Sequence, residues 1–202
     1  MKMTTNLWAM LGPLVVATLM TAPLSRAALT VDVYALNNSS SGGSPVSTIS
    51  LTAGQLFTVT VNPNDLWNAG ALPRWSNADG LTHNFYANGH DESGKAAGTL
   101  IGQNYGTWTQ NGFTAPYGAL VGKIGATYML IGTTWINKPA PASGTLQLMY
   151  WDSNNGDNTD KITAITATII PVPEPSTFLA GALLALPLGL RAIRTLRNGR
   201  RV

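Results

Sequence analysis

Hydrophobic and polar residues alternate in short runs through the middle of the chain. Between Leu29 and Leu36, Val31 and Val33 fall on one side of an extended strand and Asp32 falls on the other. Polar, glycine-rich turns separate such runs, and no convincing 3.6-residue stripe is present. Several short strands with turns between them predict an all-β fold, an antiparallel β-sandwich or jelly roll. The expected strands are 29–36, two runs within 48–61, 120–124, 128–131, 144–151 and 162–170.

The stretch from Asn62 to Pro116 has no such clear period. It is long and rich in glycine, asparagine and aromatic residues, so we expect it to form mostly loops along one edge of the sandwich. Loops that a rigid scaffold positions often carry function. The middle of the chain shows no internal repeat and no sign of a second domain. Residues 28–171 are therefore expected to fold as one unit.

The first 27 residues have the pattern of a secretory signal. Lys2 precedes the apolar run Leu7–Met20, and Ser25 and Ala27 supply the small residues that a signal peptidase requires before its cleavage site. A buried helix of the fold is the alternative, but the segment contains two prolines and has no polar face. We therefore expect export of the protein, with cleavage after Ala27.

A second apolar run lies near the other end of the chain. Phe178–Leu190 contains 13 uncharged residues, whereas a helix needs about 20 residues to span a hydrocarbon core of about 30 Å. Arg191 and Arg194 can lengthen the span by snorkelling, and the arginines beyond the run favour the cytoplasmic side. The run is therefore expected to form a short hydrophobic helix that contacts the membrane transiently.

The order of features within residues 172–202 is specific. Pro173, Glu174 and Pro175 come first, the apolar run follows, and an arginine-rich end closes the chain. This arrangement resembles the PEP-CTERM sorting domain of Gram-negative bacteria. The resemblance implies that an exosortase cuts an inner-membrane-tethered precursor near the Pro-Glu-Pro motif, and that the protein reaches the exopolysaccharide-rich cell surface. An ordinary short tail anchor is the alternative.

The formal net charge of +3 belongs to the ends of the chain. Between residues 28 and 171, five basic residues stand against eight acidic ones, which gives this part a net charge of −3. An acidic domain offers no basic patch to nucleic acid, so we expect no nucleic-acid partner. The chain also has no cysteine, which excludes thiol chemistry and a cysteine-ligated zinc ion.

Oxygen-bearing side chains gather after the strand expected at 144–151. Asp152 ends that strand, and Asp157 and Asn158 follow a short loop of serine, asparagine and glycine. Carboxylate, amide and main-chain carbonyl oxygens are the ligands that calcium prefers, whereas zinc selects histidine or cysteine. The spacing does not fit an EF-hand, because no glutamate closes the loop. Turn chemistry alone is the other interpretation, since Asn, Asp and Gly favour tight turns for local reasons.

The region around this cluster resembles a known lectin family. Tyr117–Gly125, Gly144–Tyr150, Asp152 and Gly156–Thr159 are similar to segments of the small calcium-dependent galactophilic lectins of bacteria. The resemblance implies a galactose-binding-like β-sandwich that binds one calcium ion and, through this ion, a galactoside-like sugar. It covers 116–170, is weaker over 29–75, and is absent across an insertion at 76–115.

The resemblance also assigns ligands in this chain. An aspartate at position 157, where the lectins have an amide, keeps an oxygen ligand and adds negative charge. The loop between Asp152 and Gly156 is shorter than in the lectins, so its carbonyl ligand falls on Asn154 or Asn155. The expected metal ligands are Asp152, Asp157, Asn158, Asn155 and Ala69, and the expected sugar contacts are Asp152, Ser153, Asp157 and His83. Trp67, Trp75, Trp108 and Trp151 are available as aromatic faces for a sugar.

The chain carries no recognisable catalytic pattern. His83 and His90 lie in a stretch that favours a solvated loop, no nucleophile is paired with a base, and glutamate is scarce. We therefore expect a non-enzymatic protein, and the two resemblances imply that its partner is carbohydrate of the extracellular matrix. Two alternatives stay open. One is a structural matrix protein in which calcium only stiffens the loops, and the other is a glycan-active enzyme with its active groups in 62–116.

Overall fold

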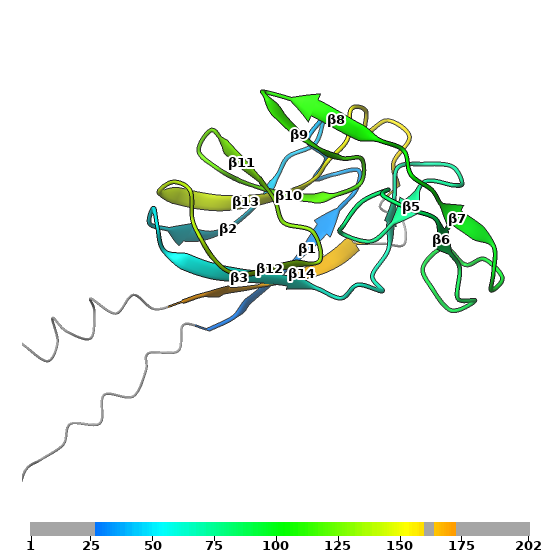
Figure 1. Ribbon diagram of the computed structural model, residues 1–202, viewed down its shortest axis with the longest axis horizontal. Helices are drawn as coiled ribbons and strands as arrows, with labels where there is room; N and C mark the ends of the chain where they lie inside the picture. The colour runs from blue at the N-terminus through cyan, green and yellow to red at the C-terminus, as the bar shows by residue number, and fades with distance from the viewer. Residues whose placement is uncertain (1–26, 160–163, 173–202) are drawn as a thin grey trace, which may run out of the picture.

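Two four-stranded sheets, antiparallel throughout, lie face to face (Figure 1). The computed structural model describes residues 27–159 and 164–172, and these residues contain no helix. The predicted all-β antiparallel sandwich is therefore confirmed. The first sheet has the order β1 (Leu29–Tyr34), β14 (Ala164–Pro171), β3 (Leu56–Val61) and β12 (Thr134–Pro139). The second has the order β11 (Thr127–Leu130), β10 (Leu120–Ile124), β13 (Gly144–Tyr150) and β2 (Val46–Leu51).

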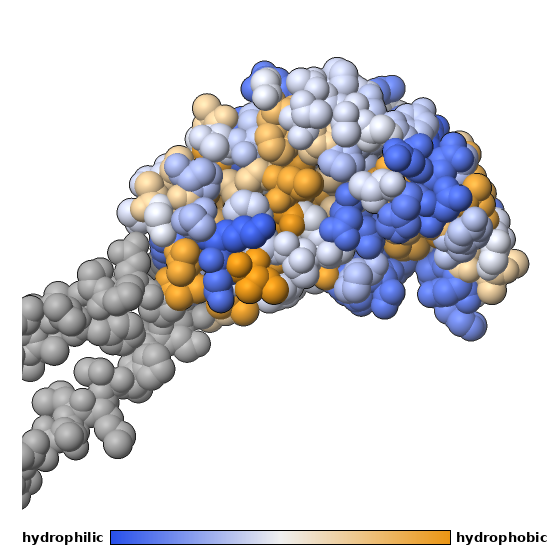
Figure 2. All heavy atoms as spheres, in the orientation of Figure 1, coloured by the Kyte–Doolittle hydropathy of each residue, from blue (hydrophilic) through white to orange (hydrophobic). Residues whose placement is uncertain are grey.

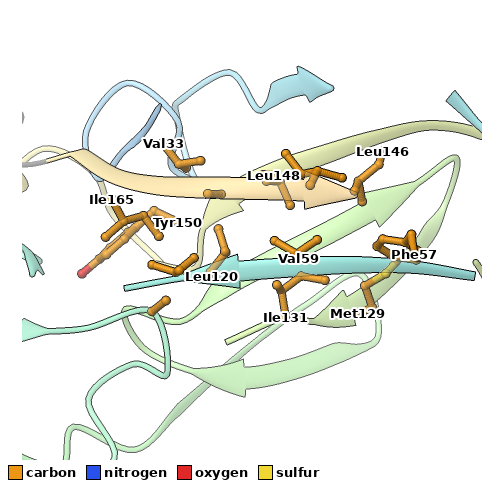
Figure 3. Close-up of a cluster of buried hydrophobic side chains, with 14 of the residues drawn as sticks. Val33, Phe57, Val59, Leu120, Met129, Ile131, Leu146, Leu148, Tyr150 and Ile165 are labelled. Atoms are coloured by element: carbon orange, nitrogen blue, oxygen red, sulfur yellow. The ribbon is translucent and has the colours of Figure 1, made fainter. Parts of the chain in front are cut away.

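The main core lies between the two sheets and follows from the period-two alternation of the strands. In β3, Phe57 and Val59 are fully buried, whereas Thr58 and Thr60 lie on the outer face of the sheet. Side chains of the second sheet meet those of the first across the space between them (Figure 3). The fully buried contributors include Val33, Ile165 and Ile169 from the first sheet, and Leu120, Ile124, Leu146, Leu148 and Tyr150 from the second.

A β-hairpin covers the outer face of the second sheet. It consists of β8 (Thr107–Gln110) and β9 (Phe113–Pro116), which pair with each other (Figure 1). Phe113 packs edge-on against the buried Trp151, with 5.3 Å between the ring centroids. The segment Leu148–Trp151 is therefore covered on both faces, which explains its unbroken run of apolar and aromatic residues. The other buried residues of this second cluster are Ala115, Ala119, Val121 and Met149.

The stretch 62–116 is more ordered than its composition predicts. Besides the hairpin, β4 (Trp67–Asn68) pairs with β5 (Trp75–Ser76), and β6 (Phe85–Tyr86) pairs with β7 (Leu100–Gly102). The expectation of loops along one edge is wrong for the hairpin, because its aromatic residues bury the outer face of a sheet. β6 and β7 rest on a small core of their own, formed by Leu66, Trp75, Ala87 and Ile101 with Phe85 against it.

The alternation of residues along the sequence does not predict β12. This strand pairs with β3, but a bulge shifts the register between Trp135 and Lys138. Asn137, inside the bulge, has a φ of 48°. A bulge places two consecutive residues opposite one, so the alternation of apolar and polar residues is lost.

The chain enters and leaves the sandwich at one end, and two long loops lie at the other. β1 begins and β14 ends at the same end, where Leu29 pairs with Ile169 (Figure 1). Loops 35–45 and 151–159 follow β1 and β13 at the opposite end. Residues 1–26 of the predicted signal at 1–27 and the segment from Pro173 onward, including the predicted helix, lie outside the described residues. Within 27–159 and 164–172, no helix is long and apolar enough to cross a membrane.

Candidate cation-binding site

Loop 35–45 lies beside the last residue of β13, at the edge of the second sheet. Ser39 forms a parallel bridge with Tyr150. The Tyr150 N–H donates to the carbonyl of Asn38 at 3.0 Å, and the Ser40 N–H donates to the carbonyl of Tyr150 at 2.7 Å. These bonds fix the direction in which the chain leaves β13 and enters the loop 151–159.

The Ser40 hydroxyl holds the backbone of Asp152 from both sides. Its Oγ donates to the Asp152 carbonyl at 2.9 Å and accepts from the Asp152 N–H at 3.0 Å. The neighbouring Ser41 hydroxyl donates to the carbonyl of Ser153 at 2.8 Å. Because both backbone groups of Asp152 are held, its side chain leaves the backbone in a fixed direction.

The Asp152 carboxylate is buried and only half satisfied. The residue is 5% exposed. Its Oδ1 accepts from the N–H of Ser153 at 2.6 Å and, more weakly, from the N–H of Asn154 at 3.4 Å. Its Oδ2 is buried and has no hydrogen-bond partner. A buried carboxylate oxygen without a partner is costly, and a cation beside it would remove that cost.

The surroundings of Asp152 shift its titration. Burial raises the pKa of its carboxyl above the ordinary value of 3.8. The Asn158 side chain and the N–H groups of Asn154 and Ser153 lower this pKa, while the nearby charge of Asp157 raises it further. Burial is the largest of these effects, so the carboxyl takes up a proton more readily than an exposed aspartate does.

Asn158 presents a second buried oxygen in the same loop. Its Nδ2 donates to the carbonyl of Ala35 at 2.9 Å, which fixes the amide plane. Its Oδ1 is buried and has no partner. The described residues contain six such buried side-chain atoms, and three of them belong to Tyr150, Asp152 and Asn158. Orphaned acceptors on neighbouring residues indicate a position for water or a cation.

The third of these atoms is the hydroxyl oxygen of Tyr150. The ring packs edge-on against Trp67 at 4.5 Å between centroids, and its hydroxyl points away from the aliphatic cluster (Figure 3). Burial, with a smaller contribution from the Asp152 charge, raises the pKa of this phenol well above its ordinary value. The hydroxyl therefore stays protonated, and it is a neutral group at the edge of the site.

Asp157 is brought near Asp152 but faces another partner. Its side chain is 43% exposed, and its Oδ2 forms an ion pair with Nη1 of Arg74. This is the only ion pair within the described residues. Arg74 is also held by its Nε, which donates to the carbonyl of Ala71 at 3.2 Å. Arg74 was not predicted as a site residue, although it is the only arginine between residues 28 and 171.

Ala69 lies in the turn that carries Arg74. Its N–H donates to the carbonyl of Arg74 at 3.0 Å, which closes the turn. Gly70, next to it, has a φ of 103°, and a Cβ atom there would lie 2.7 Å from the Asp157 carbonyl oxygen. The turn 69–74 therefore packs directly against the loop 151–159, and glycine is needed at position 70 for this close approach.

The remaining expected residues have structural contacts. Asn155 donates from Nδ2 to the carbonyl of Leu36 at 3.3 Å, and its own carbonyl accepts from the Asn158 N–H at 3.1 Å. Ser153 is half-buried, and its carbonyl accepts from Ser41. His83 is exposed. Its ring packs against Phe85, tilted by 30° with 4.2 Å between the ring centroids, and its Nδ1 lies 3.0 Å from the Thr82 hydroxyl. These contacts are outside the loop 151–159.

The expected aromatic faces are mostly packing residues. Trp67 and Trp151 are fully buried, and Trp75 is 9% exposed. Only Trp108 is half-buried, on the hairpin. The described residues contain no group of three or more histidine or acidic side chains that could hold a metal ion. A cation at this site would therefore depend on two carboxylates together with amide and main-chain oxygens.

Comparison with known proteins adds little. No family model matches the chain, and no curated protein is significantly similar to it. Among solved structures, the chain is similar to one described as the EclA N-terminal domain, a PllA-like lectin, with a TM-score of 0.41 and 17% sequence identity. The match covers 72% of this chain and 95% of that chain. At this TM-score the likeness supports no conclusion about function.

Proposed function

We propose that the loop 151–159 binds one calcium ion. The observation that carries this proposal is the pair of buried, unpartnered oxygens, Asp152 Oδ2 and Asn158 Oδ1. A carboxylate and an amide oxygen are hard donors of the kind calcium takes, and its irregular coordination tolerates a loop-built site. No cysteine is present and His83 has its contacts elsewhere, so the donor set does not suit zinc.

Asp157 is the proposed third ligand, and it requires a rearrangement. Its Oδ2 is paired with Arg74, so calcium competes with a guanidinium for the same carboxylate. The two partners are 24% and 43% exposed in their side chains, and ion pairs that water reaches contribute little stability. A divalent ion that also contacts Asp152 is therefore able to displace Arg74. The carbonyls of Asn155 and Ala69 remain proposed as further ligands.

The proposed role of the ion is to bind carbohydrate. A calcium ion with open positions accepts two neighbouring hydroxyl groups of a sugar, and flanking carboxylates accept the hydroxyl hydrogens. Support comes from the sequence resemblance of 116–170 to calcium-dependent galactophilic lectins and from the partial exposure of Asp157. The sugar class is galactoside-like, Ser153 and His83 are further proposed contacts, and the role is binding and not catalysis.

Calorimetry tests both steps. Calcium is titrated into the EDTA-treated protein, and methyl galactoside is then titrated in the presence and absence of calcium. We expect heat from calcium with the native protein and none with Asp152→Asn, while the exposed Asp32→Asn serves as the matched control. If methyl galactoside still gives a heat of binding in the presence of EDTA, sugar binding does not depend on calcium and this part of the proposal is contradicted.

The burial of Asp152 Oδ2 and Asn158 Oδ1 favours a second, purely structural function. Asp152 and Asn158 are only 5% and 7% exposed, and an ion bound this deeply can leave no position open for a sugar. Calcium would then stiffen the loops 35–45 and 151–159 and the turn 69–74 of a structural matrix protein. Calcium-dependent thermal stabilisation without heat from a panel of sugars would establish this role in place of lectin activity.

We also propose that the protein is exported and sorted to the cell surface. The support is the signal pattern ending at Ala27 and the Pro173-Glu174-Pro175 motif with its apolar run and arginines. Signal peptidase and an exosortase are the proposed processing partners. Mass spectrometry of the surface-associated protein is expected to find an N-terminus at Ala28 and a C-terminus near the motif. A surface form that retains the arginine-rich end contradicts exosortase processing.

A further inference from the structure

Exposed apolar side chains gather at the end of the sandwich where β1 begins and β14 ends. Leu56, Ile136 and Ile170 are 40%, 56% and 41% exposed. All three belong to the sheet β1-β14-β3-β12. Figure 2 shows hydrophobic atoms at this end of the molecule, with hydrophilic atoms among them. We call these three residues the basal patch.

Strand pairing shows that the basal patch is continuous. Ile170 pairs with Thr58 of β3 on one side. On the other side of β3, Thr58 accepts at its Oγ1 from the N–H of Asn137, the residue after Ile136. Leu56 lies two residues before Thr58 and therefore on the same face of the strand. Trp135 pairs with the inward-facing Val59, so the next residue, Ile136, faces outward. The three apolar side chains thus surround one position of the outer sheet face.

The chain leaves the sandwich beside this patch. The Val172 N–H donates to the carbonyl of Leu56 at 2.9 Å, which fixes the last described residue against β3. Five residues, 173–177, separate Val172 from Phe178, where the apolar run begins. Six extended residue steps reach about 20 Å at most. If Phe178 enters a bilayer, Val172 beside the basal patch stays within about 20 Å of that point.

We infer that the basal patch rests on the lipid surface while the C-terminal run is in the membrane. This inference rests on the proposed membrane contact of that run and is independent of sugar binding. Leu56, Ile136 and Ile170 would lie at the level of the lipid headgroups, where side chains of an interfacial surface are normally placed.

The inferred contact sets the orientation of the whole domain. β1 runs from the basal end to Tyr34, a length of about 20 Å for a strand of this size. Loops 35–45 and 151–159 lie at the far end of the sandwich. With the outer sheet face that carries the basal patch on the bilayer, the candidate cation site lies to the side, at the far end of the sandwich from Val172.

A single-cysteine experiment tests this contact, since the chain contains no cysteine of its own. Ile136→Cys is labelled with a polarity-sensitive fluorophore, and the chain with its C-terminal segment intact is reconstituted in vesicles of phosphatidylethanolamine and phosphatidylglycerol. Tyr86→Cys is the matched control, because Tyr86 is 59% exposed on β6, away from the basal end (Figure 1). We expect a blue shift and quenching by nitroxide-labelled lipids at position 136 and neither effect at position 86.

Other results separate membrane insertion of the C-terminal run from contact of the basal patch with lipid. Vesicle flotation reports whether the C-terminal run inserts, independently of the label. The patch contact is overturned if the protein floats with the vesicles but the label at position 136 is as exposed to water as the label at position 86. A shielded label that lipid nitroxides do not quench means that protein covers the patch, either a second copy or the chain's own C-terminal run, and also overturns it. The variant with Leu56, Ile136 and Ile170 all changed to Ser should keep flotation. With a label at Thr58→Cys, the position that these three residues surround, it is expected to lose the quenching seen there when the patch is intact.

Discussion

Arg74 and Asp157 form an ion pair between residues that are 83 positions apart in the chain. The pair joins the turn 69–74 to the loop 151–159, and Asp157 also raises the pKa of the buried Asp152 carboxyl. A guanidinium therefore occupies one carboxylate of the candidate cation site while the other carboxylate keeps an unpartnered oxygen. In the proposed calcium site, Arg74 would therefore compete with the ion for Asp157.

Replacing Arg74 is expected to strengthen calcium binding. Arg74→Met keeps the length of the side chain but frees Asp157, and a partly exposed ion pair contributes at most about 1 kcal/mol. Calcium affinity measured by calorimetry should therefore rise by up to about fivefold. Arg74→Lys keeps the charge and serves as the control, with little change expected. A weaker affinity in Arg74→Met would mean that Arg74 supports the ligand geometry and does not compete with the ion.

The pH dependence of the calcium-free protein should report on Asp152. Its folded-state pKa is raised above 3.8, so the folded state holds this proton more tightly than the unfolded state. The associated stability is present at low pH and is lost as the pH rises from 3.8 through the raised pKa. Urea denaturation in EDTA across this range should show the loss in the native protein and not in Asp152→Asn.

The affinity for calcium should change with pH in the opposite direction to the stability of the calcium-free protein. The ion binds the ionised carboxylate, so its affinity increases with pH through the same range, and binding releases a proton. Proton release is measured from calorimetric heats in buffers of different ionisation enthalpy. Equal heats in all buffers at a pH near the raised pKa would show that Asp152 is not a ligand.

The sequence was sufficient for the main sandwich because its strands alternate regularly. β3 places Phe57, Val59 and Val61 inward with threonines outward, and this pattern specifies both the strand and its buried face. The strand β12 escaped prediction because its bulge at Asn137 interrupts the alternation. The hairpin β8–β9 escaped because its role depends on a distant partner, the outer face of β13, which no local pattern reveals.

The candidate site was predictable only in part for a similar reason. Asp152, Asp157 and Asn158 are recognisable because they are close in the sequence. Ser40, which holds Asp152 from a loop 112 residues away, and Arg74, which pairs with Asp157, are brought in by tertiary structure. The one available signal was that Arg74 is the only arginine between residues 28 and 171.

Removing the Ser40 hydroxyl should loosen the site. Ser40→Ala leaves the N–H and the carbonyl of Asp152 without the partner that both now share. We expect a loss of about 1 to 2 kcal/mol in the free energy of unfolding, the usual cost of half-buried hydrogen bonds, and weaker calcium binding. Ser50→Ala is the control, because Ser50 only meets the Thr145 hydroxyl at 3.5 Å on the exposed surface. Denaturation with urea measures the first effect, and an equal loss in both variants would contradict the role given to Ser40.

A methyl group at position 70 should separate the turn 69–74 from the loop 151–159. Gly70 and Gly54 both have positive φ values, 103° and 84°, so alanine is strained at either position. A Cβ at Gly70 would meet the Asp157 carbonyl at 2.7 Å, whereas a Cβ at Gly54 meets nothing within 4 Å. The difference between Gly70→Ala and Gly54→Ala therefore isolates the contact between the two loops. We expect Gly70→Ala to lose a further 1 kcal/mol or so in the free energy of unfolding, about the cost of overpacking, and to bind calcium several-fold more weakly. Equal stability of the two variants would show that the turn moves freely and that Ala69 has no fixed place beside the ion.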